Sequence, residues 1–134
     1  MAIDIRWDKR LEVGHARIDH EHQEFLDLVR CVSLAAETDE PKPWCMRLLN
    51  EVKKYADFHF FSEENIMLRT GYPEYPAHQQ KHAELLTLLD DRIHAYATDR
   101  INLEAVVVFM FDWFAMHTTK LDKKLGKYID GLEK

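Results

Sequence analysis

Seven side chains that commonly bind metals lie on the apolar stripes predicted to form the inner faces of four helices. They are His22, His59, Glu63, His78, His82, His117 and Asp122. Burying imidazole and carboxylate groups is costly unless something charged takes up their lone pairs. A set of such groups directed at one core therefore predicts a metal centre, and this requirement constrains the fold more than any other feature of the chain.

Composition favours one compact, largely helical domain spanning residues 1–134. Of the 134 residues, 46% are hydrophobic, and only four are Gly and four are Pro. The net charge of -6 argues against nucleic acid or an anionic membrane surface as the main partner, because either would require a basic face.

The ends and the cysteines give further expectations. The opening MAIDIRWDKR is charged at positions 4, 6, 8, 9 and 10, so it lacks the apolar segment of a secretion signal, and no later stretch approaches a membrane span. We therefore expect a cytoplasmic protein. Cys31 and Cys45 have no CxxC partner, which favours two reduced thiols over a disulfide or a zinc site.

Chain-breaking residues and helical periodicity predict an N-terminal arm followed by four helices. The arm covers residues 1 to about 18, and Asp19 is a suitable N-cap for the first helix. The segment TDEPKP at 38–43 ends that helix and places Pro43 as the first residue of the second.

The turn GYPEYP at 71–76 separates the second helix from the third, and a short connection near 98–100 leads to the fourth. After the fourth helix we expect a charged, irregular tail. Short connections favour antiparallel neighbours, so the predicted fold is an all-α, up-down-up-down four-helix bundle. In that topology all seven donors lie at one end.

Spacing within the helices supports this convergence. The donors of the second helix are four residues apart, as are those of the third, which places each pair on one helix face. His117 and Asp122 are five apart, or about 140° around an ideal helix. Both can point inward only if the helix is irregular near Lys120, and we predict such an irregularity.

The type and number of donors indicate two metal ions. Imidazole with a few carboxylates suits iron, zinc, copper or nickel, and seven donors exceed the needs of one tetrahedral zinc. Two six-coordinate ions that share Glu63, Asp122 and one solvent-derived oxygen would leave about one of twelve positions vacant. One vacancy admits one small ligand, and a nitrogen-rich set favours mild, reversible chemistry.

Four segments together resemble the hemerythrin family, and specifically its single-domain bacteriohemerythrins, over nearly the whole chain. They are VGHARIDHEH at 13–22, HFFSEE at 59–64, GYPEYPAHQQKH at 71–82 and HTTKLD at 117–122. The resemblance implies two iron ions bridged by Glu63, Asp122 and an oxo or hydroxo group. His78, His82 and His117 would bind the coordinatively full iron, and His22 and His59 the iron with the vacancy.

The same resemblance implies that dioxygen binds at the vacancy. The two ferrous ions would each give an electron, the bridging hydroxide would give its proton, and a hydroperoxide would form at one iron. We therefore expect reversible oxygen binding for transport, storage or delivery, and not an enzyme.

The alternatives are an oxygen-sensing module and a di-iron peroxidase or nitric-oxide-reducing enzyme. Against the sensor, we expect no linker or second domain. The expected partners are dioxygen and an oxygen-using enzyme or reductase, and the expected state is a monomer.

Two positions depart from the family pattern. Glu21 stands where Gln is usual, beside His20, and we expect both to be solvated on the outer face. Thr118 stands where Ile is common, and its hydroxyl could either hydrogen-bond the bound oxygen species or admit water.

The other candidates for the oxygen pocket are aromatic residues near the ligands, for which ordinary core packing is the alternative interpretation. They are Phe25, Phe60, Trp113 and Phe114. His15 and His94 lie outside the constellation and are expected at the surface.

Overall fold

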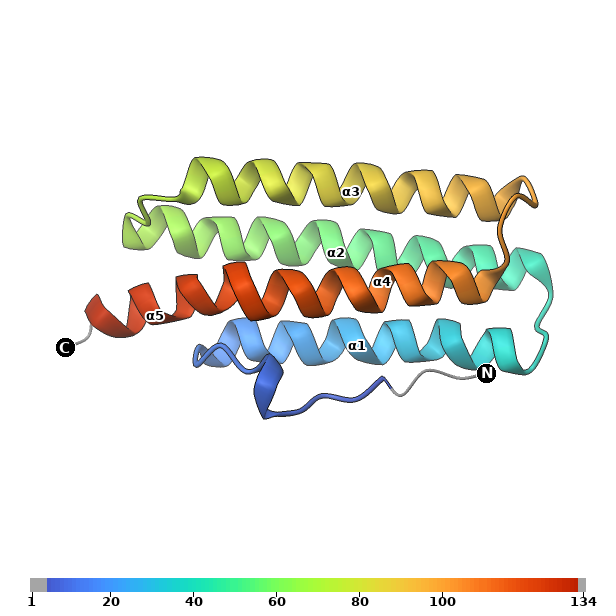
Figure 1. Ribbon diagram of the computed structural model, residues 1–134, viewed down its shortest axis with the longest axis horizontal. Coiled ribbons are helices and arrows are strands. Elements are labelled where there is room, and N and C mark those ends of the chain that lie inside the picture. The colour runs from blue at the N-terminus through green and yellow to red at the C-terminus, as the bar shows by residue number, and fades with distance from the viewer. Residues whose placement is uncertain (1–4, 133–134) are drawn as a thin grey trace.

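The computed structural model describes residues 5–132 and forms an antiparallel four-helix bundle, as predicted (Figure 1). No strand occurs among these residues. The first three helices are α1 (Ala16–Glu37), α2 (Lys42–Thr70) and α3 (Tyr75–Ala97). Residues 1–4 of the expected arm and 133–134 of the expected tail lie outside the described range.

The fourth column of the bundle has three parts. It begins with α4 (Leu103–His117), passes through the π-helical turn η2 (Thr118–Asp122) and continues as α5 (Lys123–Leu132). The predicted irregularity near Lys120 is therefore confirmed. It is a π-turn, in which one extra residue is accommodated without ending the helix.

The start of α1 differs from the prediction, because His15 and not Asp19 caps the helix. The Nδ1 atom of His15 accepts the Ile18 N–H at 3.3 Å. The Asp19 carboxylate instead accepts the N–H groups of Val13 and Gly14 at 2.8 and 3.2 Å. Asp19 thus ties the preceding arm to the first turn of α1. The start of α2 at Lys42 is one residue earlier than predicted, with Pro43 still inside the first turn.

The arm before α1 runs along the outside of the bundle (Figure 1) and includes the short 3-10 helix η1 (Lys9–Leu11). Ile5 and Leu11 are buried in the main apolar core together with side chains from all four helical columns. The arm therefore belongs to the packed structure from Ile5 onward.

The expectation of an irregular tail after the fourth helix is wrong. Leu125 and Ile129 are spaced four apart on α5, so both face inward, and they pack in a second apolar cluster with Val13, Ile18 and Met67. This cluster closes the end of the bundle beyond the seven predicted donors. The donors therefore lie between two apolar clusters.

Close contact between α5 and the arm gives a stability prediction. A Cβ added to Gly126 would lie 2.1 Å from the carbonyl oxygen of Val13, whereas one added to Gly131 would meet nothing within 4 Å. Gly126→Ala should therefore lower the melting temperature, with a cost of about 1–3 kcal/mol from overpacking. The matched control Gly131→Ala should leave the melting temperature unchanged or raise it, because Ala favours helix over Gly. Equal melting of the two variants would contradict this packing.

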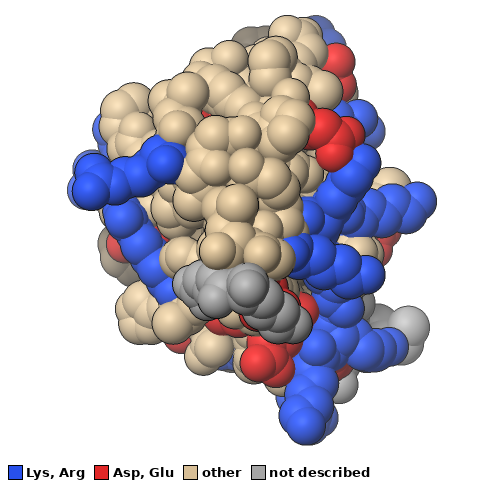
Figure 2. Space-filling view, turned by 90° about the vertical axis from the view of Figure 1, so that its left-hand side faces the viewer, with Lys and Arg blue, Asp and Glu red and all other residues tan. Residues whose placement is uncertain are grey.

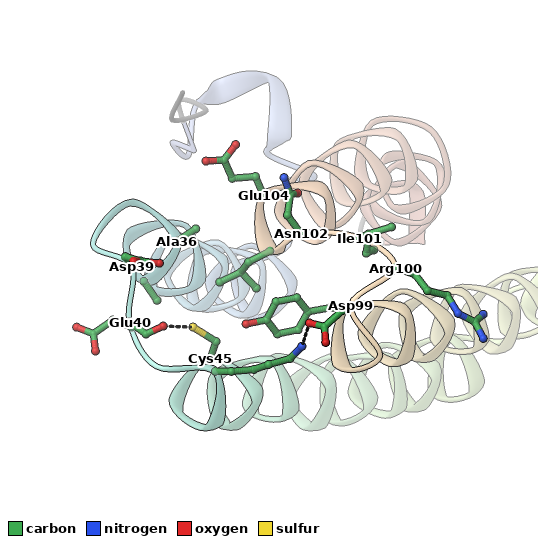
Figure 3. A pocket seen from close by; sticks show the side chains of 13 residues that line it. Ala36, Asp39, Glu40, Cys45, Asp99, Arg100, Ile101, Asn102 and Glu104 are labelled. Carbon is green, nitrogen blue, oxygen red and sulfur yellow. Dashed lines mark hydrogen bonds and ion pairs between the residues drawn. The ribbon is translucent and has the colours of Figure 1, made fainter.

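The opposite end of the bundle holds a separate cavity of about 600 Å³ between the α1–α2 and α3–α4 connections (Figure 3). Cys45 lines this cavity, and its Sγ atom lies 3.5 Å from the Glu40 carbonyl oxygen. Lys42 forms an ion pair with Asp99 beside it. Cys45 is buried and Cys31 is exposed, and both are free thiols. None of the predicted metal donors lines this cavity.

The surface charge is unevenly distributed despite the negative total. Figure 2 shows Lys and Arg side chains gathered along one side of the end of the molecule that is turned to the viewer. Exposed lysines on η2 and α5 include Lys120, Lys124 and Lys127. Net charge alone therefore did not exclude a local basic face. Within residues 5–132, no helix has both the length and the apolarity that a membrane crossing requires.

Candidate metal centre

The structure brings all seven predicted donors together at one end of the bundle. His22 comes from α1, His59 and Glu63 from α2, and His78 and His82 from α3. His117 is the last residue of α4, and Asp122 is the last residue of η2. Every one of them is buried, with at most 7% of its surface exposed.

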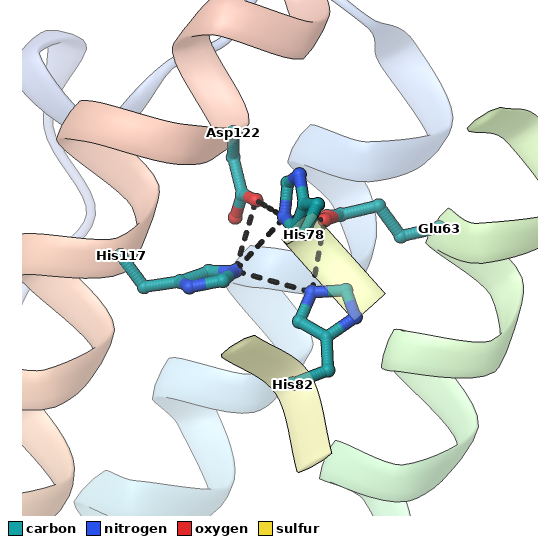
Figure 4. Close-up of side chains that lie close together, drawn as sticks. All are labelled: Glu63, His78, His82, His117 and Asp122. Carbon is teal, nitrogen blue, oxygen red and sulfur yellow. Dashed lines mark hydrogen bonds and ion pairs between the residues drawn. The ribbon is translucent and has the colours of Figure 1, made fainter. Parts of the chain in front are cut away.

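The donors fall into two groups that share the two carboxylates. In the first group, donor atoms of five residues all lie within 4.8 Å of one another. Its members, drawn in Figure 4, are Glu63, His78, His82, His117 and Asp122. The second group has four members, namely His22, His59, Glu63 and Asp122.

The contacts in the first group have the lengths expected between neighbouring ligands of one ion. Donors about 2.1 Å from a six-coordinate ion lie about 3.0 Å apart when they occupy adjacent positions. The Nε2 atom of His117 is 3.2 Å from those of both His78 and His82. Oε1 of Glu63 is 2.9 Å from His78 Nε2 and 3.2 Å from His82 Nε2.

Asp122 completes this pattern. Its Oδ1 atom is 3.1 Å from the Nε2 atoms of both His78 and His117. Among these five described residues, only the carboxylate–imidazole pairs Glu63–His117 and Asp122–His82 form no ion pair. Five donors in this arrangement exceed what a tetrahedral ion can use.

The second group uses the other oxygen of each carboxylate. Oε2 of Glu63 is 3.3 Å from His59 Nε2, and Oδ2 of Asp122 is 3.1 Å from His22 Nε2. Each carboxylate thus directs one oxygen to each group of imidazoles. This is the arrangement that a carboxylate needs in order to link two cations.

Hydrogen bonding does not account for this cluster. Both oxygens of Glu63 and of Asp122, and both ring nitrogens of His22, are buried without a hydrogen-bond partner among the described residues. Nε2 of His117, moreover, has three close neighbours, whereas a ring nitrogen carries either one proton or one lone pair. Buried polar atoms are normally satisfied, so the donor set fits cations at the two points it surrounds.

Two further carboxylates contact donor imidazoles at Nδ1, on the side of the ring that faces away from the cluster. Oε1 of Glu21 is 2.8 Å from His59 Nδ1, and Oε2 of Glu64 is 2.8 Å from His82 Nδ1. A carboxylate accepts a hydrogen bond from the Nδ1–H group, which keeps the proton on Nδ1 and the lone pair on Nε2, the atom that faces the cluster. Glu21 and Glu64 therefore fix the orientation of these two rings.

The expectation that Glu21 is solvated is wrong. Glu21 is only 6% exposed, and besides His59 it accepts hydrogen bonds from Ser62 at 2.9 Å and Arg17 at 3.2 Å. Burial by itself raises the pKa of Glu21, but the hydrogen bonds from His59 and Ser62 outweigh burial and hold the pKa below its usual value. Glu21 is therefore a buried carboxylate ion. His20 is exposed, as expected.

The other two histidines outside the cluster are placed near expectation. His94 is exposed, whereas His15 is half-buried because it caps α1.

All five predicted pocket residues line one small cavity of about 10 Å³, and they are Phe25, Phe60, Trp113, Phe114 and Thr118. The cavity also reaches His22, His59 and Asp122, which are three of the four members of the second group, together with His117. Its size is close to that needed for one water molecule. The second group therefore faces a space that suits a single small guest.

The chain matches the family model described as hemerythrin HHE cation binding domain over residues 13–129. A bacteriohemerythrin of Methylococcus capsulatus is 30% identical over 117 residues, covering 85% of this chain and 86% of the other. A myohemerythrin of Riftia pachyptila is 29% identical over 118 residues, covering 88% of each. A crystal structure of wild-type hemerythrin superimposes with a TM-score of 0.81 at 25% identity, covering 91% of this chain and 95% of that one.

These matches, together with the helical bundle and the donor cluster of this chain, define a class of helical, cation-binding proteins. The chain belongs to the hemerythrin family. Members of this family are in general non-haem iron proteins that bind oxygen rather than enzymes.

The metal-free protein should respond to pH in the direction set by its buried histidines. Burial alone lowers the pKa values of His59 and His78, but the surrounding carboxylates outweigh it and raise these pKa values to about 10 and about 9. A raised folded-state pKa contributes stability that is complete below the unfolded value of 6.5 and is lost as the pH rises through 9 to 10. The melting temperature of the metal-free protein should therefore fall between pH 7 and pH 10, as followed by circular dichroism.

Metal reverses this dependence, because bound ions replace the protons on the imidazoles. Acidification should then release the metal and lower the melting temperature together. A metal-free protein that melts equally at pH 7 and pH 10 would show that the carboxylates do not stabilise protonated histidines in this way.

Glu21 allows a test of the outer carboxylates. Glu21→Ala removes the acceptor for His59 Nδ1 and should weaken metal binding about 10- to 100-fold, measured by competition with a chelator. Glu24→Ala is the matched control, since Glu24 lies on the same helix but is exposed. If both variants hold metal equally well, Glu21 does not support the site.

Proposed function

We propose that this protein is a non-haem di-iron protein that reversibly binds dioxygen for transport, storage or delivery. His78, His82 and His117 would hold one iron, and His22 and His59 the other, with Glu63 and Asp122 bridging the two. The observation that carries the proposal is the small cavity beside the four-member group, because that group has fewer donors than its neighbour.

The numbers of donors support an open position at the second iron. Five protein donors and one shared solvent oxygen would complete six-fold coordination at the first iron. The second has four protein donors, so the same shared oxygen leaves one position, and the cavity adjoins these donors. Two ferrous ions held by these residues would supply the pair of electrons that reversible dioxygen binding requires.

The residues of this chain favour release over further reaction. Burial of all seven donors and an aromatic lining leave room for about one water molecule, so bulk water and large reductants are excluded. No buried lysine, arginine or free carboxylic acid lines the cavity among the described residues. Five imidazoles against two carboxylates also stabilise high oxidation states less than a carboxylate-rich set would.

The decisive experiment counts the metal and follows the visible spectrum. Purified protein should contain two iron ions per chain. The reduced protein should develop a visible absorption band in air and lose it under vacuum, over repeated cycles. Zinc as the only metal, or a band that forms once and never reverses, would overturn the proposal.

A variant pair tests which residues hold the iron. His82→Ala removes one member of the five-donor group and should lower the iron content to about one per chain or less. The matched control His94→Ala changes an exposed histidine on the same helix and should retain both ions. Iron content is measured after exhaustive dialysis. Equal retention would show that the site has been misassigned.

A further inference from the structure

Thr118 is the one threonine of this chain whose hydroxyl is left without a partner. The chain has six threonines, and the other five each donate to the carbonyl oxygen four residues earlier, at 2.7 to 3.1 Å. They are Thr38, Thr70, Thr87, Thr98 and Thr119. The Thr118 hydroxyl has no hydrogen-bond partner among the described residues although the residue is 0% exposed.

The local backbone explains why Thr118 differs from its neighbour Thr119. Thr118 is the first residue of the π-turn and lines the cavity, whereas Thr119 is exposed and donates to Ala115. Both residues have the same side chain in the same turn. The distinction therefore lies in position, since only Thr118 faces the space beside His22 and His59.

A buried hydroxyl without a partner destabilises the folded protein, so a partner is expected when the site is in use. The cavity of about 10 Å³ has room for about one small guest. Because a guest held next to the second metal group occupies that space, no further water can satisfy the hydroxyl. The guest itself is the available partner.

We propose that Thr118 is a positioning residue that donates a hydrogen bond to the ligand in this cavity, and thereby favours guests that accept hydrogen bonds and slows their release. The proposal deepens the proposed function, because it takes the physiological guest to be dioxygen. A hydroxyl at this position was expected either to hydrogen-bond the bound ligand or to admit water. The small cavity leaves no space for an additional water, so the hydroxyl hydrogen-bonds and retains the ligand.

Oxygen release provides the first test. In the iron-loaded protein, Thr118→Val removes the hydroxyl with little change in volume and should speed oxygen release about 5- to 10-fold, as measured by stopped-flow mixing. Thr118→Ser keeps a hydroxyl and should release oxygen within about twofold of the unsubstituted rate. Thr119→Val is the matched control and should have no effect. An unchanged release rate in Thr118→Val would overturn the proposal.

Azide provides a second test that does not need reversible oxygen binding. When azide is bound to the ferric protein, its infrared stretching band should shift between H₂O and D₂O, because an exchangeable hydroxyl donates to it. The shift should persist in Thr118→Ser and disappear in Thr118→Val. A shift of equal size in Thr118→Val would show that another donor pairs with the ligand.

Melting of the metal-free protein provides a third test, independent of iron. If the hydroxyl has no structural partner, Thr118→Val should melt at the same temperature as the unsubstituted protein or higher. A lower melting temperature in Thr118→Val would show that the hydroxyl stabilises the fold, and would overturn the proposal. If oxygen binding proves irreversible while the azide and melting results hold, the proposed function fails and the role of Thr118 stands.

Discussion

The structure depends on two buried carboxylates, Glu63 and Asp122, that lie between five imidazoles and have no hydrogen-bond partner among the described residues. Burial and mutual repulsion would each protonate such a pair, yet the nearby histidines hold the pKa of Glu63 below its usual range. Without metal, protons on the histidines must supply the positive charge. Two divalent cations would supply more charge at the points where the lone pairs meet, and they would leave no ring nitrogen shared among three neighbours.

The rest of the fold keeps this arrangement rigid and dry. The main core lies on one side of the donors, and the cluster containing Ile18, Met67 and Leu125 lies on the other. Glu21 and Glu64 set the rings of His59 and His82 from outside. A donor side chain displaced by about 1 Å would no longer share an ion with the neighbouring donors. The packing of the apolar clusters at both ends therefore contributes to metal binding.

The fold and the convergence of the donors could be predicted because both depend on periodicity, which a single sequence displays directly. The errors arose where a residue's chemical type was given more weight than its position. Glu21 is three residues after Ile18 and four before Phe25, so it shares their buried face, but a charged side chain was assigned to solvent. Likewise, the lysines of α5 suggested an irregular tail although Leu125 and Ile129 recur at helical spacing. The arm could not be placed, because its contacts with α5 are long-range and follow no local pattern.

The π-turn connects these findings. In an uninterrupted α-helix, His117 and Asp122 would point about 140° apart, and only one of them could reach the cluster. The extra residue in η2 brings both inward. The same change of phase lets Leu125 and Ile129 of α5 return to the bundle. A regular helix would therefore lose the one carboxylate on this column that both donor groups share, and it would also lose the register with which α5 closes this end of the bundle. The irregularity costs hydrogen-bond geometry in one turn, and it sets both the inward direction of Asp122 and the register of α5.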